Sequence, residues 1–193
     1  MRKQEAGYTL LEMAVVIALG LITARIAMIQ MSKAVAALDA DVAANYVVSQ
    51  TAYARQLAVD QRRNVAIGFK GNNEVTVTRQ NSDGSTTVMS DGTLPSGYTF
   101  AFPSGVKDTP DGYLAGSTLY TSSGTSGTAV FIGVGTSGTF LGDGTLVDNS
   151  NVLLNGSVFT MGAGSGTARA VTLTGSTGKL KEYWVQGTTW VVR

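Results

Sequence analysis

Hydrophobic and polar positions divide this chain into two regions. From Tyr8 to about Arg63 there is no proline and a single glycine, Gly20, among many Ala, Leu, Met, Gln and Val residues, a composition that favours a helix. From Val65 onward, short apolar or alternating runs are separated by Gly, Asn, Asp and Ser, a pattern typical of strands joined by turns. The sequence therefore predicts one long helix followed by a β-rich domain.

The expected helix has two halves of different character. Residues 8–31 are mostly apolar, broken by Glu12, Arg25 and Gln30, and as a helix they extend about 36 Å, enough to cross a hydrocarbon layer of ~30 Å. Beyond them an apolar stripe continues at helical spacing, which predicts an amphipathic second half. The stripe consists of Met31, Val35, Leu38, Val42, Tyr46, Tyr53 and Leu57. A helix of roughly 84 Å exceeds globular helices, so we expect it to pack on something outside its own domain.

The second region is expected to form antiparallel β-structure. The predicted strands are 65–70, 75–80, 86–90, 98–102, 129–134, 152–154, 158–161, 168–174, 179–185 and 188–192. The predicted hairpin turns are 71–73, 82–84, 155–156 and 186–187. Residues 84–166 are the least specified part, because small side chains define strand register poorly.

Composition excludes most catalytic chemistry. The chain has neither histidine nor cysteine, which removes the Ser-His-Asp and Cys-His triads, thiol redox chemistry, disulfides and the metal sites built on those ligands. We therefore expect no enzyme activity, no cofactor and no metal. With 14 basic and 13 acidic residues, the whole-chain charge gives no reason to expect a nucleic-acid-seeking protein, so any such activity must be local.

The N-terminal region admits two interpretations. In a secretory signal, Arg2 and Lys3 are the basic region, residues 13–24 are the apolar core, and cleavage follows that core. In a membrane anchor, the basic pair stays cytoplasmic and the rest of the chain faces outward. Glu12 favours the anchor, because a carboxylate inside an apolar segment costs on the order of 2.5–3.5 kcal/mol and a disposable signal gains nothing from it. Arg25 is expected to snorkel to the outer headgroups.

A family resemblance rests on Gly7-Tyr8-Thr9-Leu10-Leu11-Glu12 and the apolar stretch that follows. This run resembles the leader and N-methylation site of type IV pilins and type II secretion pseudopilins, whose usual form is Gly-Phe-Thr-Leu-Ile-Glu. The resemblance implies cleavage by a prepilin peptidase between Gly7 and Tyr8 and methylation of the Tyr8 amine. It also implies a pilin-like α+β fold with a leader (1–7), a transmembrane and filament-core helix (8–31), an amphipathic continuation (32–63) and a periplasmic or extracellular β domain (64–193).

The same resemblance gives Glu12 a role in assembly. In the apolar interior of a filament, the good partner for its carboxylate is the α-ammonium of a neighbouring subunit's Tyr8, and the pair compensates two desolvated charges. The implied partners are prepilin peptidase, other pilin or pseudopilin subunits and the inner-membrane assembly platform. The implied location is the bacterial inner membrane, crossed once. Residues 49–80 and 171–180 resemble the GspH/FimT-like minor pseudopilins in particular.

Two alternative functions remain open at this stage. Gly178-Lys179-Leu180-Lys181 resembles the Gly-Arg-x-Arg motif of FimT-type competence pilins, which implies a DNA-uptake pilin that uses Lys179 and Lys181, although lysine lacks the bidentate fork of arginine. The other alternative is a freely secreted β-rich adhesion domain with an ordinary signal peptide. We interpret the lysine pair as the solvated face of a C-terminal hairpin.

Two further patterns suggest ligands only superficially. Residues 133–138 match Gly-x-Gly-x-x-Gly, but the residues after them show no helical pattern, so a dinucleotide site is rejected. Four side chains could offer oxygens to calcium: Asp143, Asp148, Asn149 and Asn151. Their spacing favours turn formation instead.

Overall fold

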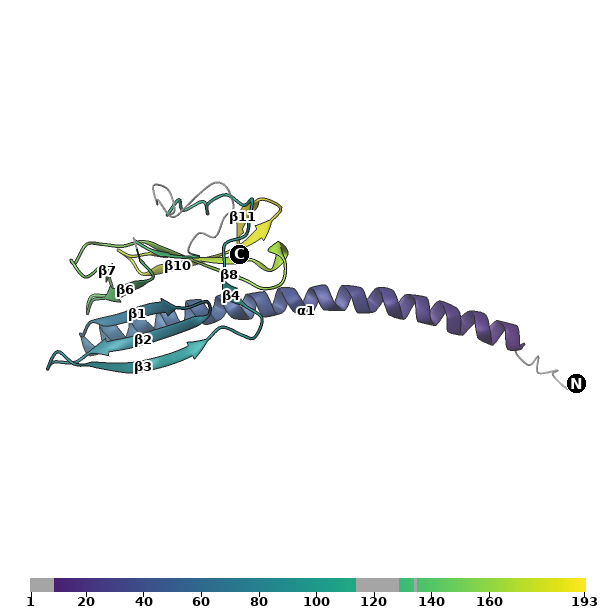
Figure 1. The fold of residues 1–193 in the computed structure, drawn as a ribbon, viewed down its shortest axis with the longest axis horizontal. Coiled ribbons are helices and arrows are strands. Elements are labelled where there is room, and N and C mark those ends of the chain that lie inside the picture. The colour runs from purple at the N-terminus through teal and green to yellow at the C-terminus, as the bar shows by residue number, and fades with distance from the viewer. Residues whose placement is uncertain (1–8, 114–128, 134) are drawn as a thin grey trace, which may run out of the picture. The chain divides into compact units, whose positions relative to one another are not determined.

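The computed structural model describes residues 9–113, 129–133 and 135–193 of the chain. One helix, α1 (Leu10–Gln61), comes first, and a short 3-10 helix, η1 (Ser165–Thr167), lies between two late strands. The strands in the described residues are β1 (Val65–Lys70), β2 (Glu74–Gln80), β3 (Thr86–Thr93), β4 (Thr99–Phe100), β5 (Val130–Ile132), β6 (Ser137–Phe140), β7 (Leu146–Val147), β8 (Gly156–Met161), β9 (Arg169–Thr174), β10 (Lys179–Gln186) and β11 (Thr189–Val192). The predicted α+β fold class is confirmed (Figure 1).

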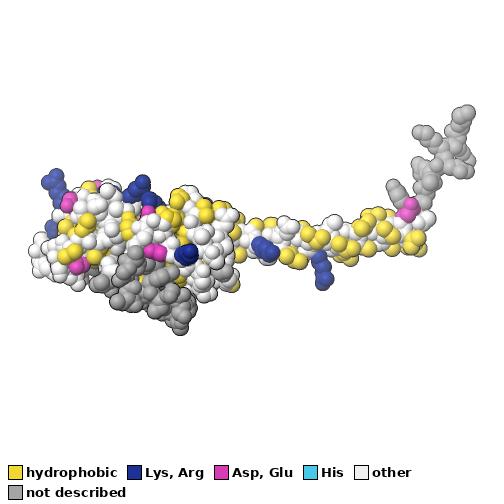
Figure 2. Space-filling view, turned by 90° about the horizontal axis from the view of Figure 1, so that it is seen from above, with side chains coloured by type: hydrophobic (Ala, Val, Ile, Leu, Met, Phe, Trp, Pro, Cys, Tyr) yellow, Lys and Arg dark blue, Asp and Glu magenta, His cyan; other side chains and the backbone are white. Residues whose placement is uncertain are grey.

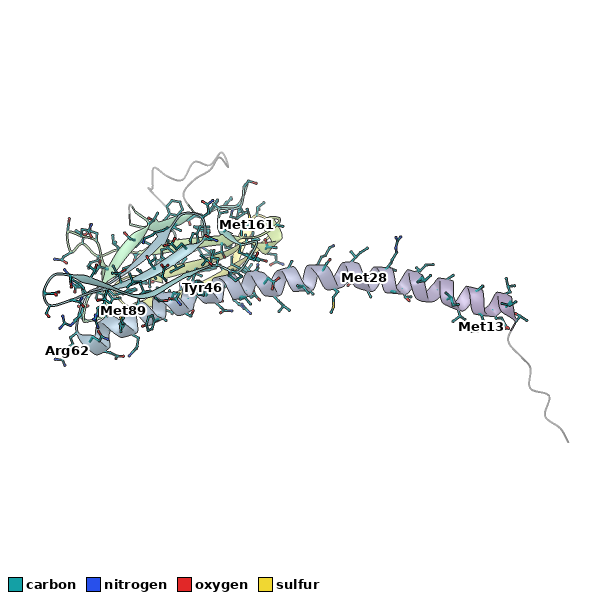
Figure 3. All side chains as sticks on the ribbon, turned by 60° about the horizontal axis from the view of Figure 1, so that its bottom comes forward. Met13, Met28, Tyr46, Arg62, Met89 and Met161 are labelled. Atoms are coloured by element: carbon teal, nitrogen blue, oxygen red, sulfur yellow. The ribbon has the colours of Figure 1, made fainter. Side chains whose placement is uncertain are left out.

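The chain divides into two compact units, residues 1–36 and 37–193, and α1 contributes to both. In the first unit every described residue of α1 from 10 to 35 is exposed, including Met13 and Met28 (Figure 3). Figure 2 shows apolar side chains over the visible face of this segment. An 18-residue window of α1 has a mean hydropathy of 2.1. The segment is therefore long and apolar enough to cross a membrane, as a signal sequence also is.

The second unit contains two antiparallel sheets and the rest of α1. Sheet A has the order β3-β2-β1-β6-β7, and sheet B has the order β11-β10-β9-β8-β4, with β5 also paired to β8. Side chains of α1, sheet A and sheet B meet in one core, which includes Val47, Ile67 and Val171. The part of α1 beyond Ala37 thus packs against both sheets, and this packing holds it in place.

The face by which α1 packs differs from the predicted stripe. Most members of that stripe are exposed, such as Leu38 at 64% and Val42 at 54%, and only Tyr46 and Leu57 pack against the core. The buried face is instead made of small residues at the same helical spacing: Ala40, Ala43, Ala44, Val47, Thr51, Ala54 and Ala58. Small side chains let the helix approach the sheets closely. The larger apolar stripe is left facing outward, where no described residue covers it.

Close packing of this small-residue face predicts a strong effect of size. Ala43 is fully buried, so Ala43→Leu is expected to lower the free energy of unfolding by about 1–3 kcal/mol through overpacking. Denaturant unfolding of the full chain in detergent, followed by tryptophan fluorescence, measures this cost. Val42→Leu, on the exposed side of the same turn, is the control and is expected to change stability by less than about 0.5 kcal/mol. Equal effects of the two substitutions would contradict the observed helix face.

The strand predictions fail mainly between residues 137 and 156. β6 and β7 were not predicted, since their sequences, Ser-Gly-Thr-Phe and Leu-Val, carry little alternation. The predicted strand 152–154 is absent and is replaced by a loop in which Leu153 makes one bridge to Val147. The predicted turn 155–156 is also wrong, because Gly156 begins β8. The other turns are confirmed, with positive φ at Gly71, Gly84 and Gly187.

A second apolar cluster covers the face of sheet B that points away from α1. Phe131, Phe159, Tyr183 and Trp190 belong to it, and Phe102, from the segment that follows β4, packs edge-on against Phe159 with ring centroids 4.7 Å apart. The described part of this segment, residues 101–113, acts as a cover for sheet B. Trp190 Nε1 donates a 2.8 Å hydrogen bond to the carbonyl oxygen of Lys107 and helps to fix the cover in place.

Candidate functional site

The N-terminus of α1 is closed by a reciprocal pair of side chains. The backbone N–H of Thr9 donates to Glu12 Oε2 at 3.0 Å, and the backbone N–H of Glu12 donates to Thr9 Oγ1 at 3.2 Å. The Thr9 hydroxyl also donates to Glu12 Oε2 at 3.2 Å. This arrangement is a capping box, in which each residue satisfies a backbone donor of the other. It also places the carboxylate at the positive end of the helix dipole.

The capping box gives Glu12 a local structural role that the sequence analysis missed. The signal was available, since Thr-x-x-Glu before an apolar run is a helix-start pattern. Glu12 is exposed and has no ionic partner among the described residues. Gly7 and Tyr8, the predicted cleavage and methylation residues, lie outside the described residues. Arg25 lies within α1 and is exposed.

The two lysines of the predicted DNA motif have different surroundings in the structure. Strand β10 carries both Lys179 and Lys181, and Leu180 packs on the α1 side of the sheet, so the predicted alternation is present. Lys179 is exposed. Lys181 instead forms an ion pair with Asp111 of the cover segment. Its ammonium is therefore committed to a partner within the chain, and DNA binding by the pair stays a prediction.

Asp111 is the centre of this polar cluster. While Lys181 binds Oδ1, Oδ2 accepts hydrogen bonds from Thr172 Oγ1 at 2.6 Å and from the Tyr183 hydroxyl at 2.8 Å. Burial raises the pKa of Asp111, but the hydrogen bonds from Lys181, Thr172 and Tyr183 outweigh it, so the pKa lies below its ordinary value of 3.8. The contact with Asp111 raises the pKa of Lys181. The lowered pKa of Asp111 and the raised pKa of Lys181 mean that both groups stay charged at neutral pH. Their ion pair connects the cover segment to β9 and β10.

This cluster predicts a pH-dependent contribution to stability. Asp111→Asn is expected to lower the free energy of unfolding at neutral pH by about 2 kcal/mol, because charged hydrogen bonds are lost. Since the folded pKa lies below the unfolded one, wild type loses this advantage as the pH falls below about 3.8, and the two proteins converge. Denaturant unfolding of both proteins between pH 7 and 2 measures the convergence. The exposed Asp60→Asn is the control, and a difference independent of pH would contradict the pairing.

The remaining polar patterns are turns, as expected. Asp143 accepts hydrogen bonds from the backbone N–H and the hydroxyl of Thr145 at 2.9 and 2.7 Å. Asp148 Oδ1 accepts from the backbone of Ser150 and Val152. Among the described residues there is no group of three or more acidic side chains that could hold a metal ion. The Gly-x-Gly-x-x-Gly match at residues 133–138 runs into β6 rather than a helix, which agrees with the rejection of a dinucleotide site.

The architecture defines the class of the chain. It is pilin-like, with a long apolar N-terminal helix that continues into a domain of antiparallel sheets. No family model, curated protein or solved structure matches this chain. The class therefore rests on the arrangement of elements described above.

Proposed function

We propose that the chain is a structural subunit of a type IV pilus or of a type II secretion pseudopilus. The observation that carries the proposal is the carboxylate of Glu12 in the first turn of a 52-residue helix whose following turns are apolar and exposed. Soluble monomers rarely leave so long an apolar surface uncovered. Both features are accounted for if the helix first lies in a membrane and later packs against other copies in a filament.

Processing and assembly follow from the N-terminal sequence. Prepilin peptidase cleaves between Gly7 and Tyr8, the new Tyr8 amine is methylated, and Glu12 becomes the fifth residue of the mature chain. Until assembly, the capping box supplies two donors to the Glu12 carboxylate, which lowers the cost of holding it near the membrane. The hydroxyls of Thr23 and Ser32 likewise donate to α1 carbonyl oxygens within 3.1 Å, so these polar groups are also satisfied within the helix.

The exposed stripe of α1 extends this packing surface beyond the membrane segment. Leu38, Val42 and Tyr53 are exposed on the part of α1 that packs on the β domain, so this part of the helix also offers apolar side chains to a neighbour. These exposed side chains of α1 are what neighbouring helices contact in the filament core.

We assign the chain to the minor, GspH/FimT-like group.

Deletion of the gene in the native organism tests the function. Surface filaments, motility and DNA uptake are scored in parallel with enzymes released to the medium. Loss of filaments or of uptake supports a type IV pilus, and loss of released enzymes alone supports a pseudopilus. A deletion strain that is normal in every assay, together with a wild-type strain that releases the chain in free form, would overturn the proposal in favour of a freely secreted β domain.

A further inference from the structure

A buried arginine lies in an apolar row of sheet B. Arg169, Val171 and Leu173 occupy alternate positions of β9, and the last two belong to the main core. The Arg169 side chain is 6% exposed. A buried guanidinium is costly unless charges and hydrogen bonds compensate it. Its partners therefore show what the position does.

Arg169 binds α1 at two points one helical turn apart. Its Nε donates to Asp41 Oδ1 at 2.7 Å, and its Nη2 donates to the carbonyl oxygen of Ala37 at 3.2 Å. Its Nη1 donates to the carbonyl oxygen of Ala168 at 3.0 Å. A single planar side chain thus connects β9 and its preceding loop to successive turns of the helix.

A second arginine completes the arrangement. Arg193 Nη2 lies 3.2 Å from Asp41 Oδ2, and Arg193 Nη1 lies 3.6 Å from Glu182 Oε2. Asp41 is therefore held between two guanidinium groups, one from β9 and one from the residue after β11. Glu182 adds a connection to β10.

The contacted residues are the first of the second unit. Ala37 opens that unit, and the helix side chains buried next are Ala40, Ala43 and Ala44. Alanine buries little apolar area, so the first docked turns gain less from packing than the later turns around Val47. Local opening begins where buried apolar contacts are few. The charged contacts are placed where apolar packing of the helix is weakest.

We propose that Arg169, Asp41 and Arg193 form a clamp that prevents α1 from separating from sheet B at the Ala37 end. Any pull on the helix residues before Ala37 reaches this end of the docked segment first. The clamp transmits this force to β9 through Arg169, and to β10 and the residue after β11 through Arg193 and its contact with Glu182. It does not depend on the filament proposal, because a freely secreted domain would hold its helix in the same way.

Hydrogen exchange of the full chain in detergent, read by mass spectrometry, tests the clamp. Arg169→Met is expected to speed exchange of backbone amides in residues 37–44 by about tenfold or more, while residues 51–61 change by less than about twofold. Arg79→Met is the matched control, because Arg79 Nη1 binds Gln61 at the opposite end of α1. This control is expected to leave residues 37–44 unchanged.

Arg193→Ala removes only the half-exposed arginine and keeps the proposal testable if Arg169→Met does not fold. It is expected to speed exchange in residues 37–44 by about threefold. Unchanged exchange in 37–44 for Arg193→Ala and for any folded Arg169→Met protein would overturn the clamp. So would a uniform rise over the helix and both sheets, because that result describes general stability.

Discussion

Glu12→Ala is expected to abolish incorporation of the subunit into filaments. In the filament that we propose, loss of the carboxylate would leave a neighbour's Tyr8 ammonium unpaired in an apolar interior, which costs about 3–5 kcal/mol. That cost corresponds to more than a hundredfold loss of incorporation. The measurement is the amount of subunit in sheared filaments relative to the amount in membranes, with processing verified in the same samples.

Two variants separate this assembly role from the capping role. Glu12→Gln keeps an acceptor for the Thr9 N–H but removes the charge, so it is expected to fail in assembly as Glu12→Ala does. Thr9→Ala removes the cap at a cost of about 1 kcal/mol and is expected to retain incorporation. The reverse result, with Glu12→Gln assembled and Thr9→Ala excluded, would show that Glu12 serves only to start the helix.

Gly175→Ala is expected to destabilise the β domain more than a methyl group added to any other glycine among the described residues. A Cβ at Gly175 would lie 1.6 Å from the carbonyl oxygen of Leu154, so the backbone must move. Gly175 also joins two segments, since its N–H donates to Asn155 Oδ1 and its carbonyl accepts from Leu146. The expected loss in the free energy of unfolding exceeds about 3 kcal/mol, because a steric conflict with the backbone is among the mechanisms that destabilise most.

Denaturant unfolding in detergent measures the loss, with Gly166→Ala as the control. Gly166 has no atom within 4 Å of an added Cβ and no unusual φ, so its substitution is expected to change stability by less than about 0.5 kcal/mol. A Gly175→Ala protein with a cost below about 1 kcal/mol would contradict the close approach of these segments.

The long helix could be predicted because its signals are local. Composition and the absence of proline located α1, which ends at Gln61 against the predicted end near Arg63. Its packing face could not be chosen, because the alanines from Ala40 to Ala58 and the larger apolar residues both recur at helical spacing. The structure buries the alanines. A hydrophobicity pattern alone favours the larger apolar residues, because larger side chains are more hydrophobic. It does not report how closely the helix backbone can approach the sheets.

The polar sites show the same limit. The Thr9–Glu12 box is visible from four consecutive residues, whereas Asp111 and Lys181 are separated by 70 positions. The partner of Lys181 depends on the path of the cover segment over sheet B, which no short pattern encodes. Arg169 likewise occupies a strand position whose alternation predicts an apolar residue, and its reason appears only when Asp41 is brought beside it.

The mass of the mature N-terminal peptide, from the protein purified out of native membranes, tests the central claim most directly. A pilin-type subunit is expected to begin at Tyr8 and to carry one methyl group on the α-amine. Cleavage of the same chain by signal peptidase would instead leave an N-terminus beyond Ala24. A mature chain that begins there, or one that retains Met1 in membranes containing active prepilin peptidase, would contradict the account.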